Sequence, residues 1–374
     1  MIRVLHVHSG NLFGGVERMM QVLSPALAGC APVHSSFALC FEGPVADTLR
    51  AANADVHILG AVRARRPNEV RGARNRLREV LLDVQPHVVI VHSAWSQAIF
   101  GRTVLNSEIP LVRWLHAPQP GPVWLEAWAS RSRPALVLCN SRYTLENVRA
   151  RFGTVPAVVQ YPPCAMKPSA PDARHAVRAA IGAREDAVVV MMAARLESGK
   201  GHSRLLEALA AVRETTWEAW IVGGVQQPAE QSYLDDLRSL AASLGIRARV
   251  RFLGQRSDMA DLLAAADIYC QPNVAPDSFG LSFVEALAAG LPVITTRLGG
   301  ATEIVDETCG VLVAPGSAQA VTCALARLMA VDGDRAALAA AARARAASFC
   351  SVPLALAELS AHLASVMPRT LALR

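Results

Sequence analysis

The chain has 374 residues and a formal net charge of +6, with 52% hydrophobic and 5% aromatic residues. This length is too great for one typical core and the composition is ordinary for a globular protein, so we expect two domains. The mild positive charge suits an acidic small ligand or an anionic membrane face, and it does not by itself indicate nucleic acid.

The eight cysteines are scattered and form no C-x-x-C pair. We therefore expect a reducing compartment and no structural zinc. The N-terminal sequence MIRVLHVHSG lacks the long apolar core and the cleavage site of a signal peptide. Because no uncharged apolar run is long enough to span a bilayer, we expect a cytoplasmic protein that is soluble or peripheral to the membrane.

Short apolar runs alternate with amphipathic stretches through the first half of the chain. This alternation predicts parallel strands joined by crossover helices. The predicted strands are residues 2–8, 88–92, 111–116, 135–140 and 157–161.

A glycine-rich loop, HSGNLFGGVERMM, follows the first predicted strand and opens a helix. It is not a G-x-G-x-x-G motif, so it is a weak indication of dinucleotide binding. Gly14 and Gly15 could still bring backbone amides against a ligand. Glu17, in the first helical turn, has an ordinary role in favouring the helix dipole.

Three strands of the first half end in histidine, at His8, His92 and His116. Three imidazoles could form a zinc site. We favour a polar contact between His116 and a substrate at its strand end, and a structural role for His92.

Seven arginines lie between Val62 and Arg78. The favoured interpretation is a solvated helix face. The alternative is docking of Arg63–Arg78 on anionic lipid, at the inner face of the membrane. Aromatic residues do not alternate with these arginines, so base stacking is not indicated.

A segment with four prolines, from Tyr161 to His175, predicts a linker. The strand–helix alternation then resumes, and the expected fold is α/β with two doubly wound Rossmann-like domains. We expect domains at 1–165 and 166–350, followed by a helical tail at 351–374. In such sheets ligands bind at the carboxyl ends of the strands. The predicted strands of the second half are residues 187–195, 218–224, 249–254, 267–272, 292–297 and 310–315.

The segment AARLESGKGH, from Ala193 to His202, follows a predicted strand. Arg195 and Lys200 can converge on one point there, and two cations suit a diphosphate. The alternative is a surface ion pair between Arg195 and Glu197. Glycines on both sides of Lys200 favour a tight loop that faces a ligand.

The segment PDSFGLSFVEALAAG predicts a helix from Leu281 to Ala289 that Gly290 ends. Its N-terminus, near Phe279–Gly280, carries unpaired N–H groups that attract an anion such as a phosphate. Asp277 and Glu285 suit sugar hydroxyls beside that phosphate. In the alternative, Asp277 is a helix cap and Glu285 is a solvated helix residue.

Together these motifs resemble the retaining glycosyltransferases of family 4, which have the two-domain GT-B fold. The family patterns R-L-x-x-x-K-G, E-x-F-G-L-x-x-x-E-A-x-A-x-G-x-P-V and G-G-x-E correspond to residues 195–201, 277–293 and 14–17. The segments FLGQRSDMADLLAAADIYCQP and RLGGATEIV also resemble the family in order and spacing. The resemblance extends over nearly the whole chain and is strongest from Ala193 to Val313.

The resemblance implies two domains that face a cleft, with the C-terminal helix crossing back to the N-terminal domain. The N-terminal domain would bind the acceptor and the C-terminal domain the nucleotide sugar. The catalytic residues implied by the resemblance would be His116 and Asp277 at the donor sugar, with Arg195 and Lys200 at the diphosphate.

The resemblance also assigns the remaining donor contacts. Backbone amides of Phe279, Gly280 and Leu281 would cradle the distal phosphate and the sugar, and Glu285 would hold the ribose. Gly14 and Gly15 would close over the phosphates, and the loop from Gly254 to Arg256 would face the base. The family's first acid is usually glutamate, and the shorter Asp277 leaves the identity of the sugar open.

The expected function is retaining transfer of a hexosyl unit from a UDP- or GDP-sugar to a glycan, a lipid-linked acceptor or a small molecule. No metal cofactor is expected, because Arg195, Lys200 and the helix start at Gly280 supply positive charge and no D-x-D is positioned to hold Mg²⁺. One alternative is a GT-B epimerase that uses no acceptor. The other is a non-catalytic protein that binds a sugar nucleotide or a membrane surface.

Overall fold

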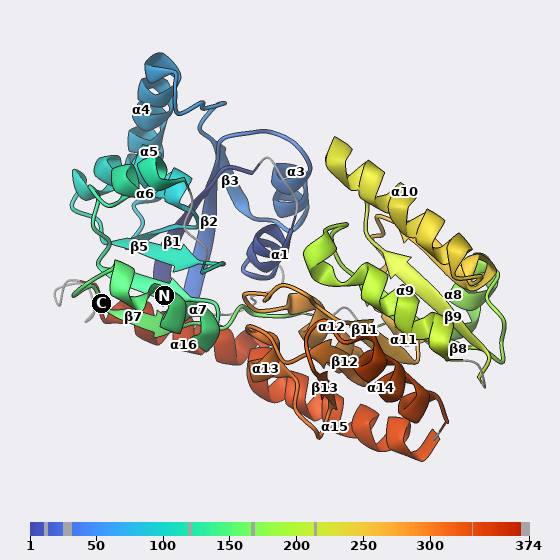
Figure 1. The fold of residues 1–374 in the computed structure, drawn as a ribbon. Helices are drawn as coiled ribbons and strands as arrows, with labels where there is room; N and C mark the ends of the chain where they lie inside the picture. Colours follow the sequence, from blue (N-terminus) through green and yellow to red (C-terminus); the bar gives the residue numbers. More distant parts are fainter. Residues whose placement is uncertain are drawn as a thin grey trace. The chain divides into compact units, whose positions relative to one another are not determined.

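The computed structural model describes residues 1–10, 14–24, 32–118, 122–165, 169–212, 215–330 and 332–367. The chain divides into two compact units (Figure 1). The N-terminal unit consists of Met1–Ala165 and Cys350–Arg374, and the C-terminal unit consists of Met166–Phe349. Each unit has a parallel sheet with helices packed on it, so the expectation of two doubly wound α/β domains is confirmed.

The sheet of the N-terminal unit has the strand order β3-β2-β1-β4-β5-β6-β7, so its winding reverses between β1 and β4. All its neighbouring strands pair in parallel. The strands are β1 (Ile2–His8), β2 (Val33–Leu39), β3 (Asp55–Ile58), β4 (Val88–Val91), β5 (Leu111–Leu115), β6 (Leu136–Cys139) and β7 (Ala157–Val159). The helices are α1 (Gly15–Val22), α3 (Pro44–Ala51), α4 (Pro67–Val84), α5 (Ala94–Leu105), α6 (Val123–Ala129), α7 (Arg142–Val148) and α16 (Val352–Ala364).

Five of these strands were predicted, and β2 and β3 were not. The sequence of β2, VHSSFAL, has polar residues inside a buried strand, where an apolar run is the usual signal. The sequence of β3, DVHI, has only four residues and lacks a clear apolar run. Both strands form through pairing with neighbours: β2 pairs with β1, and β3 pairs with β2, which extends the sheet beyond β1.

The last helix of the described chain, α16, belongs to the N-terminal unit, as Figure 1 shows. Leu356, Leu359 and Leu363 are buried in the same apolar cluster as Phe37 and Trp114. This helix therefore crosses back to the first unit, as expected from the resemblance.

A backbone hydrogen bond joins the two segments at which the chain passes between the units. Cys164 donates its N–H to the carbonyl of Cys350 at 2.9 Å. The predicted linker contains this first passage, but residues 166–168 within it lie outside the described residues.

The sheet of the C-terminal unit has the order β10-β9-β8-β11-β12-β13, and its winding reverses between β8 and β11. All six strands were predicted. They are β8 (Val188–Ala193), β9 (Trp217–Val222), β10 (Val250–Gly254), β11 (Ile268–Gln271), β12 (Val293–Thr296) and β13 (Gly310–Val313). The helices are α8 (Ala173–Ile181), α9 (His202–Ala211), α10 (Pro228–Ser243), α11 (Met259–Ala265), α12 (Leu281–Ala289), α13 (Ala301–Ile304), α14 (Ala318–Ala330) and α15 (Asp332–Cys350).

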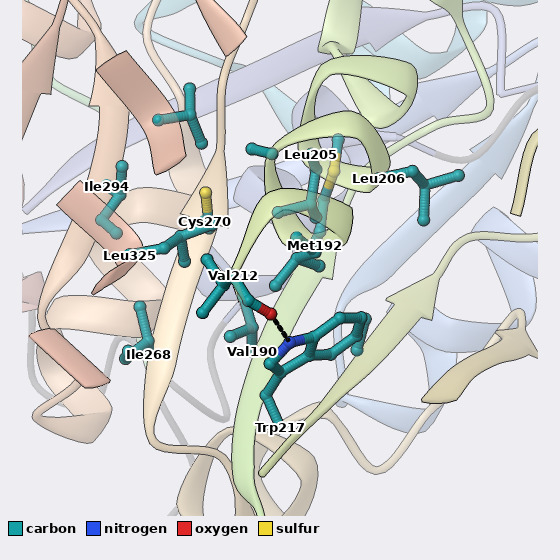
Figure 2. Packing of buried hydrophobic residues seen from close by; sticks show 14 of the residues in the cluster. Val190, Met192, Leu205, Leu206, Val212, Trp217, Ile268, Cys270, Ile294 and Leu325 are labelled. Atoms are coloured by element: carbon teal, nitrogen blue, oxygen red, sulfur yellow. Dashed lines mark hydrogen bonds between the residues drawn. The ribbon is translucent and has the colours of Figure 1, made fainter. Parts of the chain in front are cut away.

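Apolar residues from alternating strand positions and from helix faces fill the core of the C-terminal unit. Figure 2 shows Val190 and Met192 of β8 among Leu205, Leu206 and other side chains of this cluster. Trp217, at the start of β9, is 1% exposed and donates its indole N–H to the carbonyl of Val212 at 3.1 Å. The buried indole is therefore paired, which removes the cost of an unpaired polar group.

One stretch of the described residues, 335–364, is long and apolar enough to cross a membrane by length and composition. It includes most of α15 and all of α16, and 33% of its most apolar window is buried in the structure.

Candidate functional site

The candidate site lies at the winding reversal of the C-terminal sheet. The loop after β8 and the loop after β11 both leave the carboxyl edge of the sheet, on neighbouring strands. In doubly wound sheets this position is where the crevice for a ligand forms, because the following helices turn to opposite faces. The loop after β8 holds the motif at residues 195–201, and the loop after β11 leads into the motif at residues 277–293, most of which is α12.

Backbone hydrogen bonds join these two loops directly. Val274 and Ala275 donate their N–H groups to the carbonyl of Gly199, at 3.0 and 3.1 Å. Gly201 has a φ of +82°, and a Cβ added there would lie 1.9 Å from the carbonyl oxygen of Pro272. Glycine is therefore required at Gly201, both for the left-handed backbone and for the close approach of the two loops.

Lys200, held in the loop after β8, pairs with Asp277 in the loop after β11. The distance from Nζ to Oδ2 is 2.6 Å, and the side chains are 19% and 18% exposed. Asp277 is fixed from its other side as well, because Gly300 donates its N–H to the Asp277 carbonyl at 2.8 Å. Asp277 is thus part of an ion pair, and the alternative in which it caps α12 is wrong, since Gly280 is the N-cap residue.

Helix α12 begins beside this ion pair, at Leu281, and it ends at Ala289 as predicted. Gly280 has a φ of +107°, and a Cβ there would lie 2.3 Å from the ring of Phe283. The first turn of a helix exposes N–H groups that have no partner within the helix, together with the positive end of its dipole. Phe279, which is 2% exposed, stacks on Phe349 with ring centroids 6.1 Å apart and fixes the entry to the helix.

A buried polar network lies beneath the two loops, and sequence reasoning missed it. Tyr269 Oη lies 3.0 Å from the Ala193 carbonyl oxygen and 2.9 Å from Gln271 Oε1. Gln271 donates from Nε2 to Asn273 Oδ1 at 3.0 Å, and Ser282 of α12 lies 3.3 Å from Gln271 Oε1. The network ties the ends of β8 and β11 to the first turn of α12. Polar residues at alternate positions near the end of an apolar strand could have indicated it.

Burial dominates the electrostatics of this network. It raises the pKa of the Tyr269 hydroxyl well above its usual value, and the charges of Glu285 and Asp277 add to this effect. The tyrosine therefore stays protonated and acts as a hydrogen-bond donor. Within the part of the chain that the structure describes, Asn273 Nδ2 is buried and has no hydrogen-bond partner.

The other expected donor residues of this unit lie at the same sheet edge but have their own partners. Arg195 pairs with Glu197 at 2.5 Å and is 57% exposed, so it forms the surface ion pair that the sequence also allowed. Arg256 pairs with Asp258 and follows Gly254, the last residue of β10. Arg195 and Lys200 therefore pair with different carboxylates in this structure. Glu285, partly exposed on α12, has interactions of its own.

The N-terminal unit has a second cluster at the winding reversal of its own sheet. His8 ends β1 and lies 2.7 Å from Glu17 of α1, and both side chains are nearly buried. Gly14 is the N-cap residue of α1 and Gly15 is its first residue. The preceding residues, 11–13, are outside the described ranges.

The remaining histidines form a chain of hydrogen bonds. His92 Nε2 lies 3.0 Å from His6 Nδ1, and His92 Nδ1 lies 2.9 Å from His116 Nε2. Both ring nitrogens of His92 are therefore used by neighbouring rings, which does not suit a zinc ligand. In the described ranges no group of three or more histidines, cysteines or carboxylates could hold a metal ion.

These histidines are neutral at physiological pH. Burial lowers the pKa of His6 and of His116 to about 3, and neighbouring histidines contribute at His116. Burial and the neighbouring rings also hold the pKa of His92 well below its ordinary value. Sequence reasoning missed His6, although its spacing of two from His8 puts both on one face of β1.

Two parallel sheets, each with its motifs at the winding reversal, define the GT-B class of architecture. Solved structures share this fold. HepE from Anabaena in complex with UDP and glucose matches with a TM-score of 0.85 at 23% identity, over 98% of this chain and 100% of that chain. WaaG, a glycosyltransferase of lipopolysaccharide biosynthesis, matches with a TM-score of 0.68 at 21% identity, over 96% and 99%.

Two family models match the sequence. "Glycosyltransferase Family 4" matches residues 13–165, and "Glycosyl transferases group 1" matches residues 173–345. The chain belongs to the glycosyltransferases of family 4, as the sequence motifs indicated.

Curated relatives match over part of their length. The lipopolysaccharide glucosyltransferase WaaG of Escherichia coli is 32% identical over 165 residues, which are 44% of this chain and 42% of that protein. A GDP-mannose-dependent monoacylated alpha-(1-6)-phosphatidylinositol monomannoside mannosyltransferase of Corynebacterium glutamicum is 31% identical over 218 residues, 54% of this chain and 55% of that protein. The chain thus spans about half the length of the curated relatives it matches.

Proposed function

We propose that the chain is a retaining glycosyltransferase that moves a hexosyl unit from a UDP- or GDP-linked sugar to a glycan, a lipid-linked acceptor or a small molecule. The observation that carries the proposal is the Lys200–Asp277 pair beside the first turn of α12. A cation and a helix N-terminus suit a diphosphate, and a carboxylate suits sugar hydroxyls. Relatives named for lipopolysaccharide and for GDP-mannose support the range of donors and acceptors.

The proposed mechanism depends on charge at the leaving group. When the anomeric C–O bond breaks, negative charge develops on the diphosphate and positive character on the sugar ring. Lys200 and the N–H groups at Phe279, Gly280 and Leu281 stabilise that negative charge without the need for a metal ion. One such contact contributes about 3 kcal/mol, or roughly a hundredfold in rate.

Lys200 and Arg195 can both take part, although they have partners in this structure. An ammonium group has three N–H donors, so Lys200 can hold Asp277 and a phosphate oxygen together. Arg195 is more than half exposed, and an exposed ion pair such as Arg195–Glu197 is weak enough to exchange for a phosphate. The family motifs add His116 at the donor sugar, Glu285 at the ribose and Arg256 near the base.

The test is thermal unfolding with UDP, GDP, UDP-glucose and GDP-mannose, because specific binding raises the melting temperature with the logarithm of occupancy. We expect one nucleotide to stabilise the protein and Lys200→Ala to weaken its binding by roughly a hundredfold. Arg184→Ala is the control, since Arg184 is also a cation that pairs with a carboxylate, Asp186, but it lies before β8, at the opposite sheet edge. Equal binding by Lys200→Ala and Arg184→Ala would show that the diphosphate lies elsewhere.

A labelled donor distinguishes transfer from the epimerase alternative. Incubation with donor alone should leave the sugar configuration unchanged and release nucleoside diphosphate only slowly by hydrolysis. Accumulation of an epimer without an acceptor would favour the alternative.

We also propose that the N-terminal unit docks on an anionic membrane surface through α4 and α6. Arg71, Arg74 and Arg78 of α4 line a pocket of about 490 Å³ together with Trp128 of α6. Arg74 lies over the Trp128 ring, 5.9 Å from its centroid. Arginines beside an aromatic ring suit the interface of a bilayer with anionic headgroups.

Exposed apolar side chains on the same two helices support this proposal. Leu82 of α4 is 78% exposed, and Val123 and Trp124 of α6 are 85% and 52% exposed. Arg74 is also tied to α5, because it donates to the carbonyl of Ile99 at 2.6 Å, whereas the other six arginines of the run are exposed, as a solvated face requires.

Liposome sedimentation tests the membrane proposal. We expect binding to vesicles with anionic lipid that falls steeply with salt, and loss of most binding in the double variant Arg71→Glu, Arg78→Glu. The control is Arg184→Glu, Arg238→Glu, which changes the net charge equally on the C-terminal unit. Equal recovery with neutral and anionic vesicles, or equal loss in both double variants, would contradict it.

A further inference from the structure

Four polar side chains form a continuous hydrogen-bonded chain across the N-terminal sheet. Ser35 of β2 lies 3.2 Å from His6 Nε2 of β1, and the chain continues through His92 after β4 to His116 after β5. The rings are stacked, with centroids of His6 and His92, and of His92 and His116, 5.2 Å apart. Each link therefore joins neighbouring strands of one sheet.

The links are not independent of one another. A neutral imidazole has one N–H donor and one acceptor nitrogen, and each hydrogen bond in the chain needs one of each. If His116 accepts at Nε2, then His92 carries its proton on Nδ1, and His6 must do the same. If His116 donates from Nε2, all three rings carry the proton on Nε2. The chain consequently has two states, one with three Nδ1–H tautomers and one with three Nε2–H tautomers.

Ser35 selects between the two states. Its side chain is 2% exposed, and within the described residues His6 is the only hydrogen-bond partner of its hydroxyl oxygen. In the Nδ1–H state the hydroxyl donates to His6 Nε2. In the Nε2–H state His6 donates to Ser35, and the hydroxyl proton is left buried without an acceptor, which is unfavourable.

We propose that Ser35, His6 and His92 are positioning residues that hold His116 as the Nδ1–H tautomer. His116 Nδ1 has no protein partner in the described ranges, and the residue is partly exposed. Stacking on Trp114, with centroids 5.8 Å apart, fixes the plane of the ring. His116 therefore presents an N–H donor, and its role toward the donor sugar is to donate a hydrogen bond and not to act as a base. This role rests on the proposed function, whereas the tautomer does not.

The first test is nitrogen NMR of protein with ¹⁵N-labelled histidine. Long-range proton–nitrogen correlations distinguish the two neutral tautomers, and the ten histidines of the chain can be assigned with single variants. We expect His6, His92 and His116 to be neutral at pH 7 and all to be Nδ1–H. An Nε2–H tautomer at His116, or a mixture of tautomers along the chain, would overturn the proposal.

The second test is the variant Ser35→Ala, with Ser36→Ala as its control. Ser36 is also 2% exposed, is next to Ser35 and points to the other face of β2. We expect Ser35→Ala to let the Nε2–H tautomer appear at His116, and Ser35→Thr, which keeps the hydroxyl, to restore the original spectrum. Ser36→Ala should leave the spectrum unchanged.

The third test separates positioning from general structural damage. For the best nucleotide sugar among UDP-glucose and GDP-mannose, Ser35→Ala should weaken binding about fivefold, the value of one neutral hydrogen bond. Binding of the corresponding UDP or GDP should stay within about twofold, which a damaged fold would not allow. Equal weakening for nucleotide and nucleotide sugar would overturn the positioning role. The proposed function is tested separately: it fails if Lys200→Ala binds the nucleotide as well as its control variant does.

Discussion

At the residue scale, the ion pair between Lys200 and Asp277 is the contact that the sequence did not predict. Each residue was assigned to the donor from its motif, but the two are 77 positions apart and their pairing depends on the β8–β11 neighbourhood. Sequence motifs indicated which residues face a ligand. The topology of the sheet decided which of them touch each other, and Arg195 is not among them.

Asp277 is one methylene shorter than the glutamate usual in the family, and its length should decide the choice of sugar. We predict that Asp277→Glu leaves binding of UDP or GDP within about twofold, because glutamate keeps a carboxylate that can pair with Lys200. The relative binding of different nucleotide sugars should change by about tenfold, since a displaced carboxylate breaks a charge-assisted hydrogen bond. Calorimetric titration with a panel of nucleotide sugars measures both quantities. An unchanged ranking of sugars would remove Asp277 from the sugar site.

At the element scale, the sequence predicted the features that depend on local backbone conformation, such as the ends of a helix. Gly280 and Gly290 both have positive φ, and they set the two ends of α12 where the sequence indicated them. Strand β2 was missed because Ser35 and Ser36 interrupt its apolar pattern, and Ser35 is there for its hydrogen bond to His6. Ser35, one of the polar residues that prevented the prediction of this strand, is thus part of the histidine chain.

The junction between the loops after β8 and β11 gives a prediction for Gly201. Gly201→Ala should cost at least about 2 kcal/mol, because the left-handed backbone is strained for alanine and the Cβ would clash with the Pro272 carbonyl. Gly316→Ala is the control, since Gly316 has a φ of +74° and no atom within 4 Å of the added Cβ. We expect only the Gly201 variant to lose nucleotide binding, measured by the ligand-induced shift in melting temperature. Equal effects of both variants would show that the close approach of the loops is unimportant.

The histidine chain predicts how stability depends on pH. The folded pKa of His6 and of His116 is about 3, below the ordinary unfolded value of 6.5, so between these values the unfolded state binds more protons. Stability should therefore fall as the pH falls from 6.5 toward 3, by up to about 1.4 kcal/mol per pH unit for each such histidine. Urea unfolding at several pH values should show a shallower slope for His6→Gln. His175→Gln, at a site 78% exposed, should keep the wild-type slope.

At the scale of the whole molecule, the N-terminal unit is made from two separate parts of the sequence. The tail at 351–374 was expected as a separate helical segment that crosses back, and α16 indeed supplies part of the core beneath the first sheet. The apolar residues of this segment predicted a helix. The resemblance to the family predicted that this helix returns to the N-terminal domain. Composition alone could not assign it to either sheet.

This arrangement predicts a large effect for Leu359 on α16. Leu359 is 1% exposed within the N-terminal core, so Leu359→Ala should cost about 3 kcal/mol. Hydrogen exchange should accelerate by roughly a hundredfold in β1 and β4 and remain unchanged in β8 and β11. Leu354→Ala, at a position 39% exposed on the same helix, should change exchange little. Equal acceleration in both sheets would show that the two units unfold together.

The return of α16 also sets the order in which the chain can mature during synthesis. The C-terminal unit is one uninterrupted segment, Met166–Phe349, and all of it has been translated before α16 appears. The N-terminal unit is translated first, yet its core lacks Leu356, Leu359 and Leu363 until the ribosome has passed them. Domains usually complete folding in the order of translation. Here the N-terminal unit is synthesised first but completes its core last. Until α16 is made, the apolar surface that α16 will cover is available to a chaperone on the nascent protein.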